Sequence, residues 1–112
     1  LVPYGITAKG MRNDGINISA KLGTSIRAAE SGVVAYAGNE IKGFGNMLLL
    51  KHQGGLITTY AHADEIKVQR GATVKRGQII ASVGQSGSVS SPQLHFEVRE
   101  GAKAVDPMKY LD

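Results

Sequence analysis

The sequence contains no cysteine and no tryptophan, and aromatic side chains make up only 5% of its 112 residues. Without cysteine, the chain forms neither disulfides nor thiolate metal sites. Its apolar runs, such as Met47 to Leu50, are far too short to span a bilayer. The chain begins at Leu1 rather than at a methionine, and no signal peptide is evident. We therefore expect one globular domain, residues 1–112, that forms the C-terminal part of a longer protein.

The net charge of +4 invites a nucleic-acid hypothesis, which the distribution of the charges does not favour. The basic residues are scattered, and Lys75 and Arg76 are the only adjacent pair. Aromatic residues do not interleave with them, as they do in a stacking platform for bases. A generally basic surface suits polyanionic surroundings such as a cell wall or a membrane face, without identifying one.

Fifteen glycines separate short β-rich segments, and helical periodicity is almost absent. Gly54 and Gly55 predict a tight reversal between two strands, and residues 63–66 are typical of a helical turn or loop. This pattern predicts an all-β sandwich or barrel. The expected strands cover residues 15–18, 24–28, 33–37, 46–52, 56–62, 73–74, 79–83 and 93–99.

The segment from residue 91 to residue 99 carries the strongest functional pattern. In a strand, successive side chains point to opposite faces, so one face here is apolar and the other is polar. A half-exposed antiparallel strand alternates in the same way without any function, so alternation alone leaves both interpretations open. The apolar face holds Leu94, Phe96 and Val98, and the polar face holds Gln93, His95, Glu97 and Arg99.

The three histidines are the candidate metal ligands. Alternation places Thr58, Tyr60 and His62 on one face of their strand, so His62 can lie beside His95 if the two strands pack together. A zinc site needs a third protein ligand. His52 ends an apolar strand, where a structural histidine is the more common case. No serine-nucleophile, phosphate-loop or His-Glu-x-x-His motif occurs.

Taken together, the motifs resemble the LytM or lysostaphin-like zinc endopeptidase domain of peptidoglycan hydrolases, over nearly the whole chain. The resemblance implies a compact β fold of the duplicated hybrid motif type, with a groove over the central antiparallel sheet. It also implies an ancestral reaction in which a zinc-bound water cleaves peptide cross-links of the cell wall. The motifs are residues 13–18, 23–29, 32–34, 43–46, 60–62, 74–78 and 93–99.

The positions that carry function in this family are largely replaced here. The first zinc ligand, a histidine, corresponds to Asn13, and the second, an aspartate, corresponds to Asn17. The third ligand is kept as His95. Of the two catalytic histidines, one is kept as His62 and the other is replaced by Gln93.

These replacements argue against zinc catalysis. An Asn amide is neutral and a weak donor, so Asn13 and Asn17 remove an imidazole and the anionic ligand together. Without the metal, nothing lowers the pKa of a water or polarises the scissile carbonyl. Asp14 is a possible substitute donor, but it is one residue out of register, which in an extended segment turns its side chain to the opposite face. We therefore expect no cofactor and no enzymatic activity.

Degenerate domains of this kind resemble the NlpD- and EnvC-type factors, which activate the amidases that separate daughter-cell walls. That resemblance implies a periplasmic cell-wall amidase as partner, and a periplasmic location with outer-membrane anchoring through a preceding segment. The ancestral groove then becomes a docking surface. Its predicted residues are Asn13, Asn17, Tyr60, His62, Gln93 and His95, with Arg12, Lys42 and Arg99 at its rim.

Two other functions remain open. One is a zinc endopeptidase that cleaves peptidoglycan cross-links, and the other is a domain that only binds peptidoglycan. Residues 68–81 also resemble the turns of biotinyl and lipoyl carrier domains, but no attachment-lysine turn is present. A carrier function therefore has little support.

Overall fold

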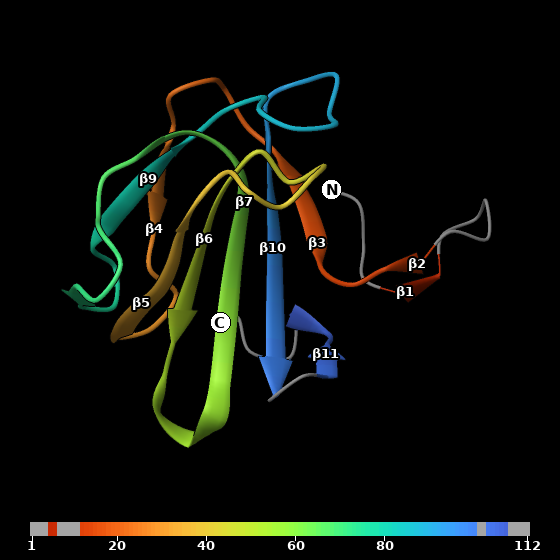
Figure 1. The fold of residues 1–112 in the computed structure, drawn as a ribbon. Helices are drawn as coiled ribbons and strands as arrows, with labels where there is room; N and C mark the ends of the chain where they lie inside the picture. Colours follow the sequence, from red (N-terminus) through yellow and green to blue (C-terminus); the bar gives the residue numbers. More distant parts are fainter. Residues whose placement is uncertain (1–4, 7–11, 101–102, 108–112) are drawn as a thin grey trace.

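The computed structural model describes residues 5–6, 12–100 and 103–107 (Figure 1). This part of the chain is built from β-strands and one short 3-10 helix, η1, and none of its helices is long and apolar enough to cross a membrane. The strands are β1 (Gly5–Ile6), β2 (Arg12–Asn13), β3 (Ile16–Ser19), β4 (Ser25–Arg27), β5 (Gly32–Gly38), β6 (Asn46–Lys51), β7 (Leu56–Ile66), β8 (Thr73–Val74), β9 (Ile79–Val83), β10 (Gln93–Glu100) and β11 (Lys103–Val105), with η1 at Gln53–Gly55.

Nine of these strands form one antiparallel sheet, which confirms the all-β prediction. Its main path runs β11-β10-β7-β6-β5-β8, and β3 pairs with β10, whereas β9 pairs with both β4 and β7. β1 and β2 form a separate two-stranded ribbon. Strand β10 is central, because it pairs with β7, β3 and β11.

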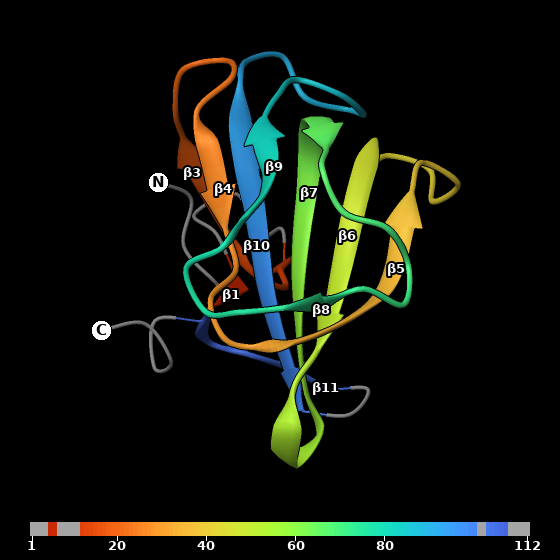
Figure 2. The same ribbon diagram turned by 90° about the vertical axis from the view of Figure 1, so that its left-hand side faces the viewer.

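The core lies between the long strands and a layer that crosses them. Figure 2 shows the connection from β4 to β5, together with β8, passing across β10, β7 and β6. The alternating apolar residues of the long strands point toward this layer. The buried core residues are Ile16, Ile26, Ala28, Val34, Leu48, Leu50, Tyr60, Ala63, Val74, Ile80, Ala81, Val83, Phe96 and Val98.

Strand β7 is longer than the sequence predicts. The predicted reversal at Gly54 and Gly55 is present, and β6 and β7 pair as an antiparallel hairpin. The turn predicted for residues 63–66 is wrong, because β7 continues to Ile66. Asp64 and Glu65 have low strand propensity, but pairing of this segment with β9 holds it extended.

A backbone irregularity at His62 changes the face to which its side chain points. His62 has a φ of 66°, and the β6–β7 register shifts between Asn46 and Leu48. A bulge of this kind interrupts the alternation along a strand. The prediction that Thr58, Tyr60 and His62 share a face is therefore wrong: Thr58 and Tyr60 face the core, and His62 turns toward His95 on the other side of the sheet.

Candidate functional site

Strand β10 carries a row of interacting polar side chains on the face away from the core. The His95 Nε2 donates to Glu97 Oε2 over 2.7 Å. The other carboxylate oxygen, Oε1, accepts from Arg99 Nε at 2.9 Å and lies 2.8 Å from an Arg99 terminal nitrogen. His95 and Glu97 are only 7% and 4% exposed, so these interactions are formed away from bulk water. The sequence-predicted polar face of β10 is thus a connected network.

Strand β3 extends this network sideways. Residue Asn17 is the direct antiparallel partner of His95, and its Oδ1 accepts from His95 Nδ1 at 3.0 Å. The amide nitrogen of Asn17 donates to Gln93 Oε1 at 2.8 Å. We call the five residues Asn17, Gln93, His95, Glu97 and Arg99 the polar row.

His62 completes the cluster from β7. Its ring centroid lies 6.2 Å from that of His95, and the ring of Phe44 stacks on it at 6.5 Å with an interplanar angle of 14°. The His62 Nδ1 donates to the Ser86 carbonyl at 2.9 Å, which leaves Nε2 as the nitrogen with the lone pair. The ring is therefore fixed in one tautomer by the β9–β10 loop.

Two loops meet above the cluster. Ser88 N donates to the Gly43 carbonyl at 3.0 Å, and Asn46 N donates to Ser86 Oγ at 3.0 Å. Gly45 has a φ of 63°, and a Cβ there would collide with atoms of Ser86, so only glycine permits this approach. The β5–β6 and β9–β10 loops are thereby held together, with Phe44 over both histidines.

The environment moves two pKa values at this site. Burial acts to raise the pKa of Glu97, but the hydrogen bonds and charges of His95 and Arg99 outweigh it, so the pKa is lowered and the carboxylate stays ionised. For His62, burial lowers the pKa and the nearby His95 lowers it further, against the hydrogen bond to Ser86. His62 is therefore a neutral imidazole at neutral pH.

The polar row does not supply a zinc donor set. Both ring nitrogens of His95 are engaged in hydrogen bonds, Nδ1 with Asn17 Oδ1 and Nε2 with Glu97 Oε2, so a metal ion at His95 would have to displace one of them. Asn17 is neutral, and the Glu97 carboxylate is held by His95 and Arg99. Over residues 5–6, 12–100 and 103–107, no group of three or more His, Cys, Asp or Glu side chains is placed to hold a metal ion. The two aligned ligand positions, Asn17 and His95, are joined directly by a hydrogen bond.

The predicted groove residues do not all gather at this site. Asn17, His62, Gln93, His95 and Arg99 do. Tyr60 does not, and its assignment to the groove is corrected: it is 1% exposed, packs on Phe96 with centroids 5.4 Å apart, and its hydroxyl accepts from Ala29 N at 3.0 Å.

The predicted rim residues are spread around the site. Lys42 is exposed on the β5–β6 loop, which is held to the β9–β10 loop. Arg12 and Asn13 lie in β2, and their side chains are outside the described part of the structure. Asp14, the alternative metal donor, instead has its carboxylate 3.9 Å from Arg99.

His52 lies apart from these residues, and its contacts are those of a structural histidine. Its Nδ1 donates to the Ser31 carbonyl at 2.8 Å, and its Nε2 is hydrogen-bonded to Thr58 Oγ1 at 2.7 Å. Thr58 is in turn hydrogen-bonded to the Tyr60 hydroxyl at 2.9 Å. This buried series of hydrogen bonds connects His52, just before η1, to the core side of β7.

Sequence reasoning missed three residues of the site. Glu97 was visible on the polar face of β10 but was not included among the groove residues. Phe44 and Ser86 lie in glycine-rich loops, where no alternation or spacing indicates the direction of a side chain. Only the contact between the two loops brings them to His62.

Solved structures identify the fold. The chain matches lysostaphin from Staphylococcus simulans with a TM-score of 0.92 and 31% identity, over 99% of this chain and 48% of that chain. It matches a mutant catalytic domain of the prophage-encoded M23 protein EnpA from Enterococcus faecalis with a TM-score of 0.89 and 32% identity, over 96% of this chain and 87% of that one. The fold is that of lysostaphin-like peptidase domains.

The model of peptidase family M23 matches residues 11–107, and the chain belongs to that family. Among curated relatives, it is 46% identical to the uncharacterized lipoprotein YgeR of Escherichia coli over 99% of this chain and 43% of that protein. It is 43% identical to the murein hydrolase activator NlpD of Escherichia coli, over 88% of this chain and 26% of that protein. It is 44% identical to the cell division protein DipM of Caulobacter vibrioides, over 96% of this chain and 19% of that protein. The chain thus spans less than half the length of these relatives.

The lowered pKa of His62 predicts a pH dependence of stability. As the pH falls below about 6.5, the unfolded state takes up this proton before the folded state does, so the free energy of unfolding decreases toward acid until the folded pKa is reached. Asparagine tolerates the left-handed backbone at position 62. In the His62→Asn variant, the part of the decrease in unfolding free energy that comes from His62 is therefore expected to vanish. Urea unfolding of the unmodified chain and of the variant between about pH 5 and 8 measures this difference. If the free energy of unfolding had the same pH dependence in both proteins, the lowered pKa of His62 would be contradicted.

Proposed function

We propose that this chain is a non-catalytic M23 domain that binds and activates a cell-wall amidase in peptidoglycan remodelling and daughter-cell separation. The observation that carries the proposal is the hydrogen bond between Asn17 Oδ1 and His95 Nδ1, at two positions where the resemblance implies zinc ligands. The names of NlpD and DipM, a murein hydrolase activator and a cell division protein, support it. A periplasmic location, with anchoring through a preceding segment, belongs to the same proposal.

The docking surface in this proposal consists of the polar row, His62 and the loop that carries Lys42. His62, His95 and Glu97 are nearly buried, so they shape the surface more than they touch a partner. Asn17, Gln93 and Arg99 are partly exposed and are the members that a partner reaches. An amidase with a closed and an open form is activated if this surface binds the open form more tightly than the closed form. The shift toward the open form is limited by the difference between these two affinities.

The proposal predicts release of dye from labelled peptidoglycan only when the purified domain and an amidase from the same cell are mixed. Replacing Gln93 with alanine removes a partly exposed side chain of the surface and is expected to weaken activation roughly tenfold at subsaturating domain. Lys42→Glu should also weaken it. Arg70→Glu makes the same change of charge at an exposed position between β7 and β8, and is the matched control.

The same assay distinguishes the other functions. Release by the domain alone, abolished by a chelator, would show a zinc endopeptidase and overturn the proposal. Sedimentation with purified cell wall, without an effect on any amidase, would show a passive peptidoglycan-binding domain. If Arg70→Glu weakens activation as much as Lys42→Glu, the docking surface lies elsewhere.

A further inference from the structure

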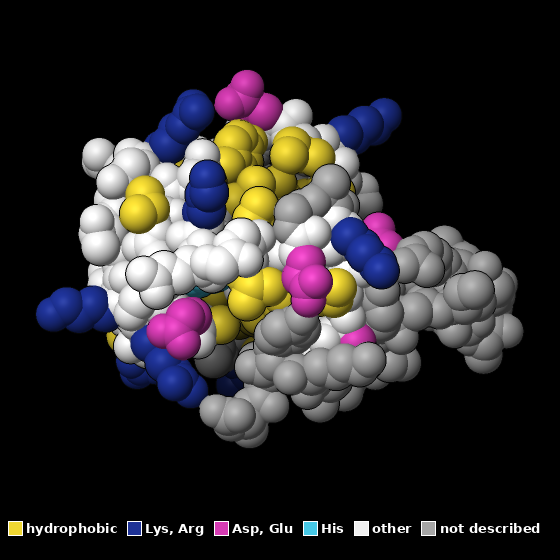
Figure 3. Space-filling model, turned by 90° about the horizontal axis from the view of Figure 1, so that it is seen from below, with side chains coloured by type: hydrophobic (Ala, Val, Ile, Leu, Met, Phe, Trp, Pro, Cys, Tyr) yellow, Lys and Arg dark blue, Asp and Glu magenta, His cyan; other side chains and the backbone are white. Residues whose placement is uncertain are grey.

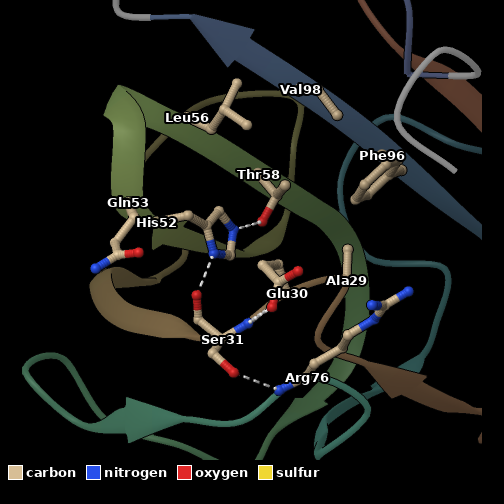
Figure 4. A pocket seen from close by; sticks show the side chains of 10 residues that line it. All are labelled: Ala29, Glu30, Ser31, His52, Gln53, Leu56, Thr58, Arg76, Phe96 and Val98. Atoms are coloured by element: carbon tan, nitrogen blue, oxygen red, sulfur yellow. Dashed lines mark hydrogen bonds between the residues drawn. The ribbon is translucent and has the colours of Figure 1, made fainter.

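One ring nitrogen of His62 has no hydrogen-bond partner within the described part of the chain. The sequence has three histidines. Both ring nitrogens of His95 bond to members of the polar row, and both ring nitrogens of His52 bond to neighbours, as the dashed lines of Figure 4 show. At His62 only Nδ1 is bonded, to the Ser86 carbonyl. The Nε2 atom of His62 is therefore the imidazole nitrogen that remains available to a partner.

This available nitrogen is a hydrogen-bond acceptor that reaches the surface. A carbonyl oxygen only accepts, so the hydrogen of the neutral ring is on Nδ1 and Nε2 carries the lone pair. Among the described residues, no fully buried side-chain nitrogen or oxygen lacks a hydrogen-bond partner. Because Nε2 has no partner, it must be accessible, although His62 as a whole is only 6% exposed. The site thus presents one acceptor within a nearly buried side chain.

The position of this acceptor is fixed before any partner binds. The ring of Phe44 stacks on His62 at an interplanar angle of 14°, and the ring of His95 meets it edge-on at 60°. The Ser86 carbonyl sets the rotation of the ring. The backbone φ of 66° is costly for a histidine, and costs of this kind concentrate at binding and catalytic sites. An acceptor held in this way loses little conformational entropy when it is bound.

The surroundings favour an uncharged donor. The buried carboxylate of Glu97 lies 2.8 Å from an Arg99 nitrogen, so its charge is already matched. Burial disfavours the charged form of His62 itself, as its lowered pKa indicates, and would penalise an incoming ammonium or guanidinium in the same way. A neutral N–H or O–H costs less to remove from water. Because two loops meet above the cluster, a side chain reaches Nε2 more readily than a main chain does.

The opposite face of β10 has no equivalent acceptor and provides a comparison. Phe96, which alternates with the polar row, lines a cleft of about 500 Å³ there. The histidine of this cleft, His52, has both nitrogens bonded (Figure 4). Its charged lining residues, Arg76 and Glu30, have opposite signs, and Figure 3, seen from below, shows basic and acidic side chains beside the apolar area at that end. A donor that seeks a free imidazole nitrogen is therefore expected only at His62.

We propose that His62 Nε2 accepts a hydrogen bond from an uncharged side-chain N–H or O–H of the amidase. This hydrogen bond rests on the proposed function, because its donor belongs to the activated enzyme. It assigns to one atom the chemistry that the partner supplies. The partly exposed Asn17 and Gln93 contact the partner around it.

Imidazole ¹⁵N spectra of the histidine-labelled chain, titrated with an unlabelled amidase from the same cell, observe this atom directly. In the free chain, His62 Nε2 should resonate as an unprotonated nitrogen. In the complex it should move part of the way toward the protonated range, and the change should saturate with amidase. His52 is the control within the same spectrum, because both of its nitrogens are bonded on the opposite face, and its resonances should not move.

Variants of both partners identify the two ends of the bond. His62→Asn keeps the left-handed backbone and removes the acceptor. With its amide spectrum showing an intact fold, it should weaken activation roughly tenfold at subsaturating domain, because the donor of the amidase is left unpaired. Gln93→Ala removes a different contact, so at saturating amidase the change at Nε2 should persist. Among alanine substitutions of Asn, Gln, Ser, Thr, Tyr or Trp in the amidase, one should return Nε2 to its free position.

The outcomes separate this hydrogen bond from activation itself. If the amidase is activated but Nε2 does not move, the hydrogen bond is refuted and the proposed function stands. If Nε2 reaches the protonated range, or if only a Lys or Arg substitution in the amidase reverses the change, the donor is charged and the assignment is wrong. If no side-chain substitution reverses it, the donor is a main-chain amide, which also contradicts the assignment. If no amidase changes any amide resonance of the domain, the proposed function fails, and the hydrogen bond fails with it.

Discussion

Combined replacement Asn13→His, Asn17→Asp and Gln93→His should convert the chain into a protein that binds one zinc ion, whereas the unmodified chain should show no saturable zinc binding. The substitutions restore two imidazoles and one carboxylate at positions that the family resemblance aligns with a ligand or a catalytic histidine, and together with His95 these are the kind of donors that hold Zn²⁺. The register supports this design, since residue 17 lies directly opposite His95. The carboxylate introduced at position 17 would face Nδ1 of His95, and Glu97 would keep its hydrogen bond to Nε2 and orient the ring.

Calorimetric titration with zinc chloride, followed by metal analysis after dialysis, measures this result. We expect the triple variant to bind at least roughly a thousandfold more tightly than the unmodified chain. Asn17→Asp alone is the matched control, because it adds the charge without the two imidazoles. Adding His95→Ala to the triple variant should abolish the gain. Stoichiometric zinc in the unmodified chain, or none in a folded triple variant, would contradict the assignment of the ancestral ligand positions.

Loss of the Glu97 carboxylate should lower the free energy of unfolding by about 3–5 kcal/mol, because Glu97→Ala leaves His95 and Arg99 without their shared partner in a nearly buried site. Arg99→Ala should cost less, since the Arg99 side chain is 32% exposed and the screening by water is greater. Glu65→Ala removes an exposed carboxylate on β7 and should change stability by less than about 0.5 kcal/mol.

The pH dependence of this loss gives a second measurement. The folded pKa of Glu97 is lowered from the ordinary value of 4.5, so its contribution is complete above that pH and is lost as the pH falls through the folded value. The stabilities of the unmodified chain and of Glu97→Ala should therefore converge in acid. Urea unfolding at about pH 7 and near pH 3 tests this. A constant difference between the two proteins would show that packing, rather than charge, explains the effect.

Local patterns predicted the strands, but not the relations between distant strands. Alternation along β10 was sufficient to place His95 and Glu97 on one face, because strand geometry has a fixed period of two. It did not reveal that Asn17 lies opposite His95, since nothing local specifies which strand pairs with β10. The family resemblance aligned both residues with zinc ligands, and the register then explained how they meet.

The face of His62 was mispredicted for a different reason. The bulge that turns its ring toward His95 depends on a positive φ, which a histidine adopts only when the surroundings impose it. Here the surroundings are the Ser86 carbonyl and the ring of Phe44, which come from two loops far from His62 in the sequence. Tyr60 precedes the bulge and stays in the core, although alternation had grouped it with His62.

The pairing of β3 with β10 determines when the polar row can form during folding. Asn17 and His95 are 78 positions apart, and the hairpin of β6 and β7 lies between them. Closing so long a loop before other strands are in place is entropically costly, so local hairpins form first and distant pairs later. We therefore expect the surface proposed for docking to assemble late in folding. A chain interrupted before β10 lacks Gln93, His95, Glu97 and Arg99, so a partner that recognises the polar row recognises only completed molecules.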